Sequence, residues 1–455
     1  MKFGMKAALL AMALCAPSAA NAQETLTIWW AKGFYQAEDT ALFDVIKKFE
    51  DKTGVKVDLS QYSVQDLVPK TVAALDAGTP PDVAYADVFD AQVAGKWAFE
   101  GKLEDLSDIL VPIKDRFAPM TLETTFLYND QTKARAYYAF PLKQNVFHIE
   151  IWKDRLAQAG FTEADIPKDW KAYWNFWCDT VQPALRKATG ERDYVVGLPM
   201  GVESNDSAST FNTFMDAYSI SLVDADGKVD IDDADRQGLI GAVTDYTELY
   251  NKGCMPPSVT SWKDPDNNAA FANRSILMTM NGTISIATKW LDDSNNASLT
   301  EEERAQAKKN YEENIITGEF PNAVDGSPMA YRSGVKTGLV FKDSKNKARA
   351  REFVEFLLQE ENLTPYVEGA LGRWFPVTPV ADDSPFWTAD KHRQAVLTQY
   401  ATGNTLPYAY TQNYKFTILV NENVFAQALN AVVIDKLPVE QAVDNMIARI
   451  KEVAG

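Results

Sequence analysis

The stretch at residues 137–152, YYAFPLKQNVFHIEIW, holds the pattern that decides the fold. It begins as an aromatic run, breaks at Pro141, and resumes from Val146 with the alternation of a β-strand. Proline fixes its own φ, removes one donor from a strand ladder and pushes Phe140 into an extended conformation. We therefore expect one long, bent, extended segment that leaves one sheet near Pro141 and enters a second. The chain would then have two lobes, with a cleft beside the crossing.

Residues 1–22 are typical of an export signal. Two lysines precede a short apolar run at 7–16, and residues 20–22 (Ala-Asn-Ala) form a small-x-small cleavage site. The apolar run is too short to span a bilayer. A lipoprotein signal at Cys15 is the alternative. We predict cleavage before Gln23 and a soluble mature protein in the periplasm.

The length and the net charge of the chain indicate how many domains it has and which partners it does not bind. A chain of 455 residues exceeds one comfortable hydrophobic core and favours two domains. The formal net charge of −18 argues against a nucleic-acid partner, because phosphate binding needs clustered lysine and arginine.

Two cysteines, Cys178 and Cys254, remain after removal of the signal. They could pair in an oxidising compartment. The sequence does not show whether their Cα atoms lie close enough, so a disulfide and two free buried thiols both stay open.

The segment after the signal alternates between apolar strands and amphipathic helices. Strands are predicted at 26–30, 55–59 and 83–86, and helices at 41–53 and 64–77. This order implies right-handed crossovers and a parallel sheet. Ligands bind beyond the carboxyl ends of such strands, here around residues 30–35 and 86–90. Strand alternation should bury one of Trp29 and Trp30 and turn the other towards the cleft.

Several stretches, each a loose motif when taken alone, then occur in a specific order and spacing. They are LTIWW, FEDKTGVKVDL, AGTPPDVAYADVF, KWAFEGKLEDLSDI, the crossing segment with KDRLAQAGF after it, PKDWKAYWNF, FANRSILMTMNGT, GVKTGLVFKDSKNKARAREFVEFLLQEENL, GALGRWFPVTPV and LPVEQAVDNMIARIKEVAG. Together they resemble the extracellular solute-binding proteins of sugar ABC transporters, in the maltose-binding-protein-like family 1. The resemblance covers nearly the whole mature chain.

The resemblance implies an α/β periplasmic binding protein fold with two lobes, a hinge and a central ligand cleft. Carried over, the first lobe is 24–140 plus 332–375, and the second is 141–331 plus 376–455. The residues support the return to the first lobe independently. The segment 335–341 is strand-like, and Ser344 is placed to cap a helix that runs through Glu361.

Catalytic and metal sites find little support in the sequence. Its two histidines, His148 and His392, lie far apart and have no G-x-S-x-G partner, so a zinc site or serine triad is not expected. The S-x-x-K at Ser333 and the K-T-G at Lys336 share one lysine, whereas β-lactamases use two. The stretch at 221–232, SLVDADGKVDID, favours a hairpin over a calcium loop. We expect no enzyme activity, no cofactor and no metal.

The expected function is that of a monomeric periplasmic component of an ABC importer, which binds a sugar or oligosaccharide between its lobes. The resemblance implies the partner, an inner-membrane permease driven by a cytoplasmic ATPase. Aromatic rings cover sugar faces while polar side chains bond the hydroxyls. The candidate ligand-binding residues are Trp30, Phe34, Tyr35, Asp87, Gln144, Asn145, Asn281, Arg373, Trp374, Tyr408 and Tyr410.

Within this set, we predict that Trp374 lies flat against a sugar ring while Arg373 reaches a hydroxyl or an anionic substituent. The alternative is that Trp374 fills the lobe interior. Other functions also stay open: a binding protein for an acidic or sulfonated sugar, a polyol or a polyamine, or an exported glycoside hydrolase. A hydrolase needs two opposed carboxylates. The sequence has 63 acidic residues, so a suitable pair can always be chosen and its existence does not indicate a hydrolase.

Overall fold

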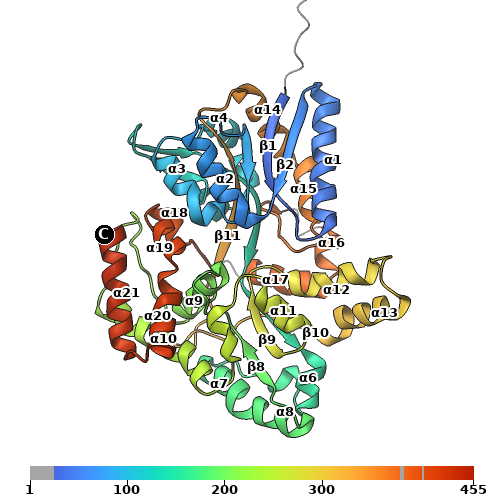
Figure 1. Ribbon diagram of the computed structural model, residues 1–455, viewed down its shortest axis with the longest axis vertical. Helices are drawn as coiled ribbons and strands as arrows, with labels where there is room; N and C mark the ends of the chain where they lie inside the picture. Colours follow the sequence, from blue (N-terminus) through green and yellow to red (C-terminus); the bar gives the residue numbers. More distant parts are fainter. Residues whose placement is uncertain (1–24, 380–383, 402–403) are drawn as a thin grey trace, which may run out of the picture.

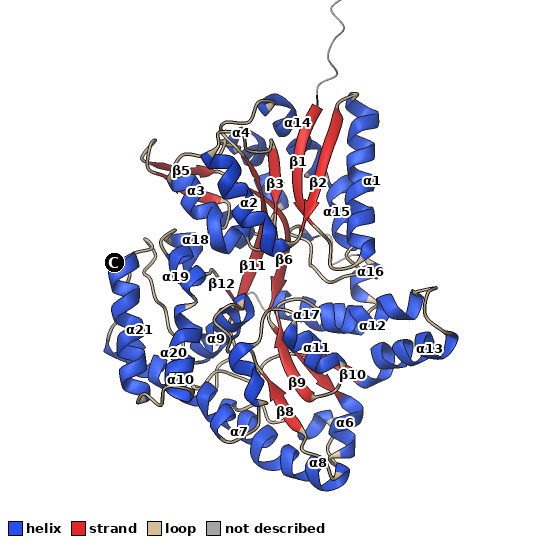
Figure 2. Cartoon of the chain, in the orientation of Figure 1, coloured by secondary structure: helices blue, strands red, loops and turns tan. Residues whose placement is uncertain are grey.

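The computed structural model describes residues 25–379, 384–401 and 404–455, and the predicted export signal lies outside this part. The described chain builds two main sheets, one above the other in Figure 1 and Figure 2, with β6 and β11 running between the two halves. The larger sheet has six strands: β1 (Thr25–Ala31), β2 (Lys56–Tyr62), β3 (Val83–Tyr85), β6 (Phe140–Val146), β11 (Tyr331–Val340) and β12 (Thr405–Leu406). The smaller has four: β7 (His148–Trp152), β8 (Tyr194–Gly197), β9 (Ile276–Asn281) and β10 (Ile315–Gly318).

Helices surround both sheets. Those before β6 are α1 (Gln36–Thr53), α2 (Val64–Asp76), η1 (Asp90–Ala94), α3 (Gly95–Phe99), α4 (Ser107–Leu110), η2 (Val111–Arg116) and α5 (Pro119–Glu123), followed by the hairpin of β4 (Phe126–Asn129) and β5 (Ala134–Tyr137). Those between β7 and β11 are α6 (Lys153–Gln158), η3 (Glu163–Asp165), α7 (Trp170–Asn175), η4 (Phe176–Val181), α8 (Gln182–Thr189), α9 (Asn205–Ala217), α10 (Asp233–Asn251), η5 (Pro257–Ser261), α11 (Asp266–Ala272), α12 (Ser285–Asn295), α13 (Glu301–Lys309) and η6 (Asn310–Asn314). Those after β11 are α14 (Lys347–Leu357), α15 (Glu360–Glu368), α16 (Pro385–Thr388), α17 (Lys391–Ala401), α18 (Ala409–Gln412), α19 (Phe416–Glu422), α20 (Val424–Val433) and α21 (Val439–Ala454).

The predicted βαβαβ start of the chain is confirmed. Strand β1 pairs in parallel with β2 on one side and with β3 on the other. The predicted apolar face of the first helix is buried, from Leu42 to Phe49. The helix begins at Gln36, however, and not at Ala41. Its first turn carries Glu38 and Asp39, whose charges suit a helix N-terminus, so part of the predicted loop is helical.

The crossing between the sheets lies at Phe147 and not at Pro141. Strand β6 runs through Pro141 to Val146 against β11, and β7 starts at His148 in the other sheet. The antiparallel pairing of β6 with β11 shifts register between Lys336 and Thr337, opposite the proline. Such a bulge is where a strand tolerates a residue that has no N–H to donate. The strand therefore bends past Pro141 without leaving its sheet.

The return segment differs from its prediction in one respect. Strand β11 is present, but the predicted helix from Ser344 to Glu361 is two helices, α14 and α15, separated at Leu358–Gln359. Ser344 is not the cap residue of α14. Its hydroxyl donates to Oδ1 of Asp82 at 2.6 Å, and so joins this turn to the start of β3.

The second half of the molecule contains an aromatic core and a disulfide. Trp170, Trp174 and Trp177 are all buried. Cys178 and Cys254 are bonded to each other, with their Cα atoms 5.3 Å apart, so the disulfide that the sequence left open is formed.

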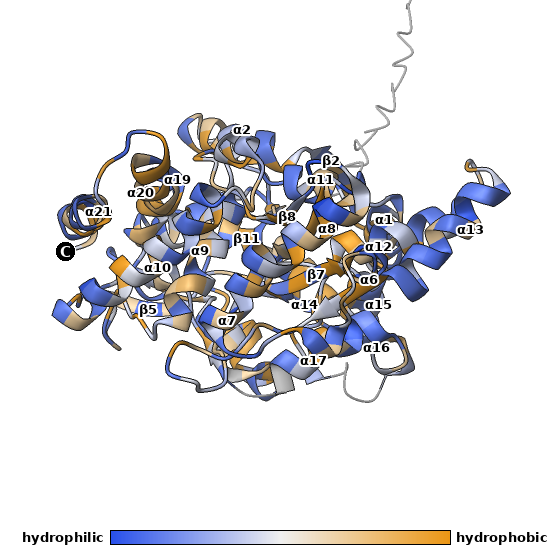
Figure 3. Cartoon of the chain, turned by 90° about the horizontal axis from the view of Figure 1, so that it is seen from below, coloured by the Kyte–Doolittle hydropathy of each residue, from blue (hydrophilic) through white to orange (hydrophobic). Residues whose placement is uncertain are grey.

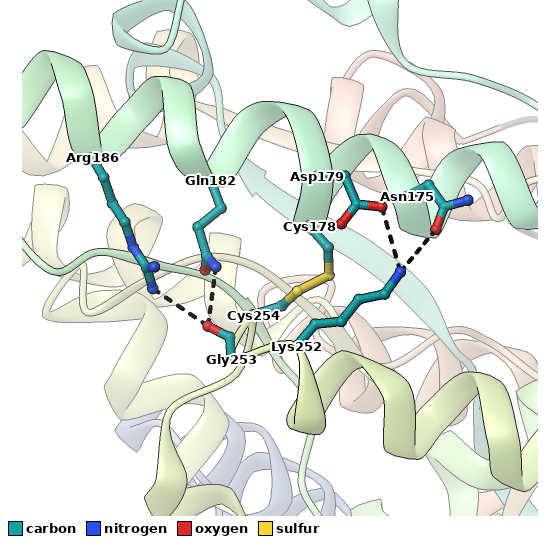
Figure 4. The surroundings of a disulfide bond; sticks show 8 residues. All are labelled: Asn175, Cys178, Asp179, Gln182, Arg186, Lys252, Gly253 and Cys254. Carbon is teal, nitrogen blue, oxygen red and sulfur yellow. Dashed lines mark hydrogen bonds and ion pairs between the residues drawn. A yellow bond between two sulfur atoms is a disulfide. The ribbon is translucent and has the colours of Figure 1, made fainter.

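Polar contacts flank the disulfide on both sides (Figure 4). The side chains of Gln182 and Arg186 donate to the carbonyl oxygen of Gly253, at 3.0 and 3.3 Å. Lys252 donates to the side chains of Asn175 and Asp179. The bond thus fixes the end of α10 against η4 and α8.

Two helical regions stand out by composition. The segment Phe416–Val433 has the length and hydropathy of a membrane span, but 61% of it is buried and Asn423 breaks it with a φ of 50°. It belongs to the core. By contrast, α13 projects from the body and is strongly hydrophilic (Figure 3). A capping box formed by Thr300 and Glu303 starts this helix.

Candidate functional site

A cavity of about 1040 Å³ opens between the two sheets. Its lining comes from both halves of the chain: the loops after β1 and β3, the crossing at Asn145 and Phe147, one face of α9, the first part of β11, the loop after α15, and the segment around β12 and α18. This is the position expected for a ligand site in an open α/β sheet, beyond the carboxyl ends of β1 and β3.

Helix α9 supplies a polar strip along the cavity. Asn205, Ser209, Asn212 and Asp216 recur at helical spacing and line it, while the other side of the helix packs into the core. Eleven residues of helix correspond to about 16 Å of length. The strip is therefore longer than a single sugar ring.

Strand β11 supplies cations from the opposite side. Arg332, Gly334 and Lys336 alternate along the strand and all line the cavity, as residues two apart share one face. Nη2 of Arg332 lies 2.7 Å from Oδ1 of Asp216, and Nζ of Lys336 lies 3.2 Å from Oδ2 of Asp90. Both cations are therefore neutralised by carboxylates.

A second group of charges surrounds Arg373 on the loop after α15. Its guanidinium lies 3.1 Å from a carboxylate oxygen of Glu38 and 3.5 Å from one of Asp87. Nζ of Lys143 reaches the same two carboxylates at 3.8 and 3.5 Å. Burial alone would raise the pKa of Asp87, but the charges of Lys143 and Arg373 outweigh it and hold the pKa below its usual value.

The aromatic residues that line the cavity include Phe34, Tyr408 and Tyr410. Phe34 is 49% exposed, with the Arg373 guanidinium 4.8 Å from its ring centroid. Tyr408 and Tyr410 stack on each other at 5.2 Å, and the hydroxyl of Tyr410 donates to Asp90. An accessible ring beside hydrogen-bonding groups suits a ligand with apolar faces and a polar rim.

The structure brings most of the predicted site residues together. Those that line the cavity are Phe34, Asp87, Asn145, Asn281, Arg373, Trp374, Tyr408 and Tyr410. Trp374 is only 3% exposed, and Lys143 and Arg373 both lie over its ring, at 4.5 and 4.7 Å from the centroid.

Three predicted site residues do not line the cavity. Trp30 is buried against Tyr85, and its indole N–H donates to the Tyr366 hydroxyl. The side chain of Gln144 is occupied in joining the extended segments, since it donates to the carbonyl of Pro376 at 2.8 Å and accepts from Ser333.

Tyr35, the third, is buried at the contact between the loop after β1 and the start of α12. Its hydroxyl donates to the carbonyl oxygen of Ser285 at 2.6 Å. Burial raises its pKa well above the ordinary value for tyrosine. This hydrogen bond connects the two halves of the molecule beside the cavity.

Sequence reasoning missed several cavity charges. Lys336 carries a readable signal, because it lies on a strand that was predicted from residue 335 onwards, whereas Arg332 precedes the predicted start of that strand. Glu38 was assigned to a loop and Asp216 to no element, so neither could be placed. Asn205 and Asp206 also line the cavity, as the first residues of α9.

The two histidines meet in the structure, although they are distant in sequence. Nε2 of His148 lies 3.3 Å from Oε1 of Glu150, whose other oxygen accepts from Thr317, and Thr317 also contacts Nδ1 of His392 at 2.7 Å. Both rings are fully buried, that of His148 on β7 of the smaller sheet and that of His392 on α17, and neither lines the cavity. Within the described residues, no group of three or more His, Cys, Asp or Glu side chains is arranged to hold a metal.

Comparison with known proteins agrees with this architecture. Residues 44–395 match the family described as bacterial extracellular solute-binding protein, numbered family 8 where the sequence suggested family 1. No curated protein matches the chain.

Solved structures share the fold at low identity. An ABC transporter solute-binding protein of Thermotoga lettingae TMO, bound with α-D-tagatose, is 20% identical with a TM-score of 0.75, over 95% of this chain and 100% of that one. A sugar transporter protein of Arthrobacter chlorophenolicus A6 with bound laminaribiose is 16% identical with a TM-score of 0.73, over 95% and 100%. A maltose-bound protein of T. maritima is 18% identical with a TM-score of 0.69, over 94% and 99%.

The family match covers well over half of the chain, and the solved structures share its fold. This family consists of binding proteins and not of enzymes, which removes the glycoside hydrolase alternative. The chain belongs to the bacterial extracellular solute-binding proteins.

Proposed function

We propose that this protein binds a sugar or oligosaccharide in the cavity between its two lobes and delivers it to an ABC permease in the inner membrane, which a cytoplasmic ATPase drives. It would act as a monomer in the periplasm after removal of its export signal. The observation that carries the proposal is the cavity lining, where the exposed ring of Phe34 and the tyrosine pair stand beside amides, hydroxyls and carboxylates. The sugars bound by the similar structures point the same way.

A buried amide oxygen supports a ligand rich in hydroxyl groups. Oδ1 of Asn145, in the cavity lining, has no hydrogen-bond partner within the described residues. Buried polar groups are nearly always paired. A sugar hydroxyl can donate to this oxygen.

Charge balance disfavours the acidic and sulfonated sugars that Arg373 had left open. Its guanidinium already faces Glu38 and Asp87, so an anionic group would meet two carboxylates that already balance the charges of Arg373 and Lys143. A neutral or basic sugar meets no such repulsion.

Closure of the cleft gives the first test. The lobes, for which the sequence suggests 24–140 plus 332–375 and 141–331 plus 376–455, would rotate about the extended crossings, the first of which the strand pairing moves to Phe147. Because a ligand that touches both lobes favours the closed state, small-angle X-ray scattering should show a smaller radius of gyration at saturating ligand. The ligand is found beforehand by a thermal-shift screen of mono- and oligosaccharides, polyols and polyamines. A radius that stays the same would contradict closure.

The Phe34→Ala substitution tests the aromatic contact. We expect a loss of about 1–2 kcal/mol in binding, from the apolar contact of one exposed ring, with little change in melting temperature. Phe43→Ala is the matched control, since Phe43 is 42% exposed on α1 and does not line the cavity. Titration calorimetry of both variants gives the comparison. Equal affinities would exclude a stacking role for Phe34.

A further inference from the structure

The positive and negative charges that line or border the cavity balance, apart from two carboxylates. The cations that border it are Arg332, Lys336, Arg373 and Lys143, and the carboxylates that contact them are Asp216, Asp90, Glu38 and Asp87. Lys32 and Asp224, also in the lining, have opposite charges and cancel in the sum. Asp206 and Asp264 remain, and within the described residues neither forms an ion pair.

The two remaining carboxylates differ in their hydrogen bonds. Asp264 accepts from the Ser204 hydroxyl at 2.8 Å, from the Asn205 amide at 3.0 Å and from the backbone N–H of Asp206 at 3.1 Å. The Asp264 carboxylate therefore has three hydrogen-bond donors within the described residues. The side chain of Asp206 receives no hydrogen bond from the part of the chain that is described, although it lines the cavity.

The surroundings of Asp206 favour a positively charged ligand group as its partner over a hydroxyl group. Burial raises its pKa well above the ordinary value, and the carboxylate of Asp264 adds to the shift. Lys336 on β11 and Arg373 lower it, but each is already committed to another carboxylate. Tyr246 of α10, which also faces this group, stays neutral because burial raises its pKa.

The N-terminus of α9 offsets part of this negative charge. A helix N-terminus is equivalent to about half a positive charge, whereas two carboxylates carry two negative ones. The excess at this end of the cavity is therefore larger than the helix dipole can neutralise. A neutral sugar would leave it uncompensated.

We propose that the ligand is an aminated sugar, whose protonated amine binds against Asp206 at the start of α9. The proposal rests on the sugar-binding function proposed above and names the chemical class within it. The ammonium would supply both the charge and the hydrogen-bond donors that the Asp206 carboxylate lacks. The rest of the sugar would follow the polar strip of α9.

Matched sugars that differ in one substituent provide the test. Chitosan, chitin and cello-oligosaccharides carry an ammonium, an acetamide and a hydroxyl at the same ring position, and glucosamine with glucose and galactosamine with galactose add monosaccharide pairs. By calorimetric titration, we expect the amine to bind at least about tenfold more tightly than its neutral counterparts, as for a paired charge in a partly desolvated site.

The Asp206→Asn variant should abolish that preference. Glu203→Gln is the control, because it removes the same charge three residues away, where Glu203 is exposed and pairs with Lys263 outside the cavity. The control should keep the preference for the amine. A preference that survives in Asp206→Asn, or amines that bind no better than neutral sugars, would overturn this proposal and leave sugar binding intact. If no carbohydrate binds, both proposals fail.

Stability and pH separate a binding role from a structural one. An acid whose folded-state pKa is raised lowers stability as the pH rises from its unfolded towards its folded pKa. Asp206→Asn should therefore melt at a higher temperature than the parent at neutral pH while it binds the amine more weakly. Amine affinity in the parent should fall as the pH is lowered, because a proton then competes for the carboxylate. A destabilised variant would mean that Asp206 holds the fold together and does not await a cation.

Discussion

Replacing Trp374 by alanine is expected to lower the free energy of unfolding by about 3–5 kcal/mol, the usual cost of removing a buried tryptophan side chain. The indole is 3% exposed, and its ring lies under the cationic groups of Lys143 and Arg373. Truncation removes these contacts together with the packing. The sequence favoured a ring that lies flat against a sugar; its burial supports the alternative, in which it fills the wall of the cavity.

Thermal melting and calorimetric titration of Trp374→Ala distinguish these interpretations. If Trp374 fills the wall of the cavity, the variant should have a lower melting temperature than the parent. If Trp374 stacks on the ligand, the variant should bind the ligand more weakly at an unchanged melting temperature. Phe34→Ala provides the contrast within the same cavity, because Phe34 is accessible and Trp374 is not. A Trp374→Ala protein as stable as the parent would show that the ring is available to the ligand after all.

Removing the disulfide is expected to have an effect of similar size. Cys178 and Cys254 are 76 residues apart in sequence, and closing a loop of that length stabilises the folded state by about 4 kcal/mol in the chain-entropy description. The double variant Cys178→Ala with Cys254→Ala should therefore melt well below the parent. Since neither cysteine lines the cavity, its ligand affinity at low temperature should be unchanged.

Reduction of the parent protein is the natural control for the double variant. Both sulfur atoms are buried, so the reductant is applied to unfolded protein before refolding. The reduced parent should then melt near the double variant, and adding reductant to the variant should change nothing. Equal melting temperatures for the oxidised parent and the double variant would contradict the expected stabilisation.

Local sequence patterns were enough to predict many of the strands and helices of this fold. The residues at which these elements begin and end were less predictable. The strands before residue 86 and the apolar face of α1 followed from periodicity alone. Pro141 was taken as the crossing because a proline removes a ladder donor and bends an extended segment. In the structure β6 instead bulges at Leu142, opposite the distant strand β11, and this irregularity accommodates the proline. Likewise, Ser344 has the chemistry of a helix cap, but Asp82 takes its hydroxyl. Each difference comes from a partner far away in the sequence.

The site residues that could be predicted are those in the loops that follow the strands of the parallel sheet. Asp87 and Phe34 follow β3 and β1, where ligands of parallel sheets bind, and both line the cavity. Trp30, one position inside its strand, faces the core instead. The balance of charges was not predictable, because Arg373 and Glu38 are 335 positions apart and meet only in the folded chain.

The place of β11 in the larger sheet affects when the protein can fold. Residues 331–340 lie between β3 and β6, so the sheet that begins at Thr25 stays open until the ribosome has made most of the chain. Contacts of such long range form slowly. For a protein of an extracellular family this delay is useful, since a chain without a closed first sheet remains threadable through a translocation channel. The same delay exposes the unpaired edge of β3 to other chains meanwhile, so folding before export is disfavoured and a chaperone that covers this edge is advantageous.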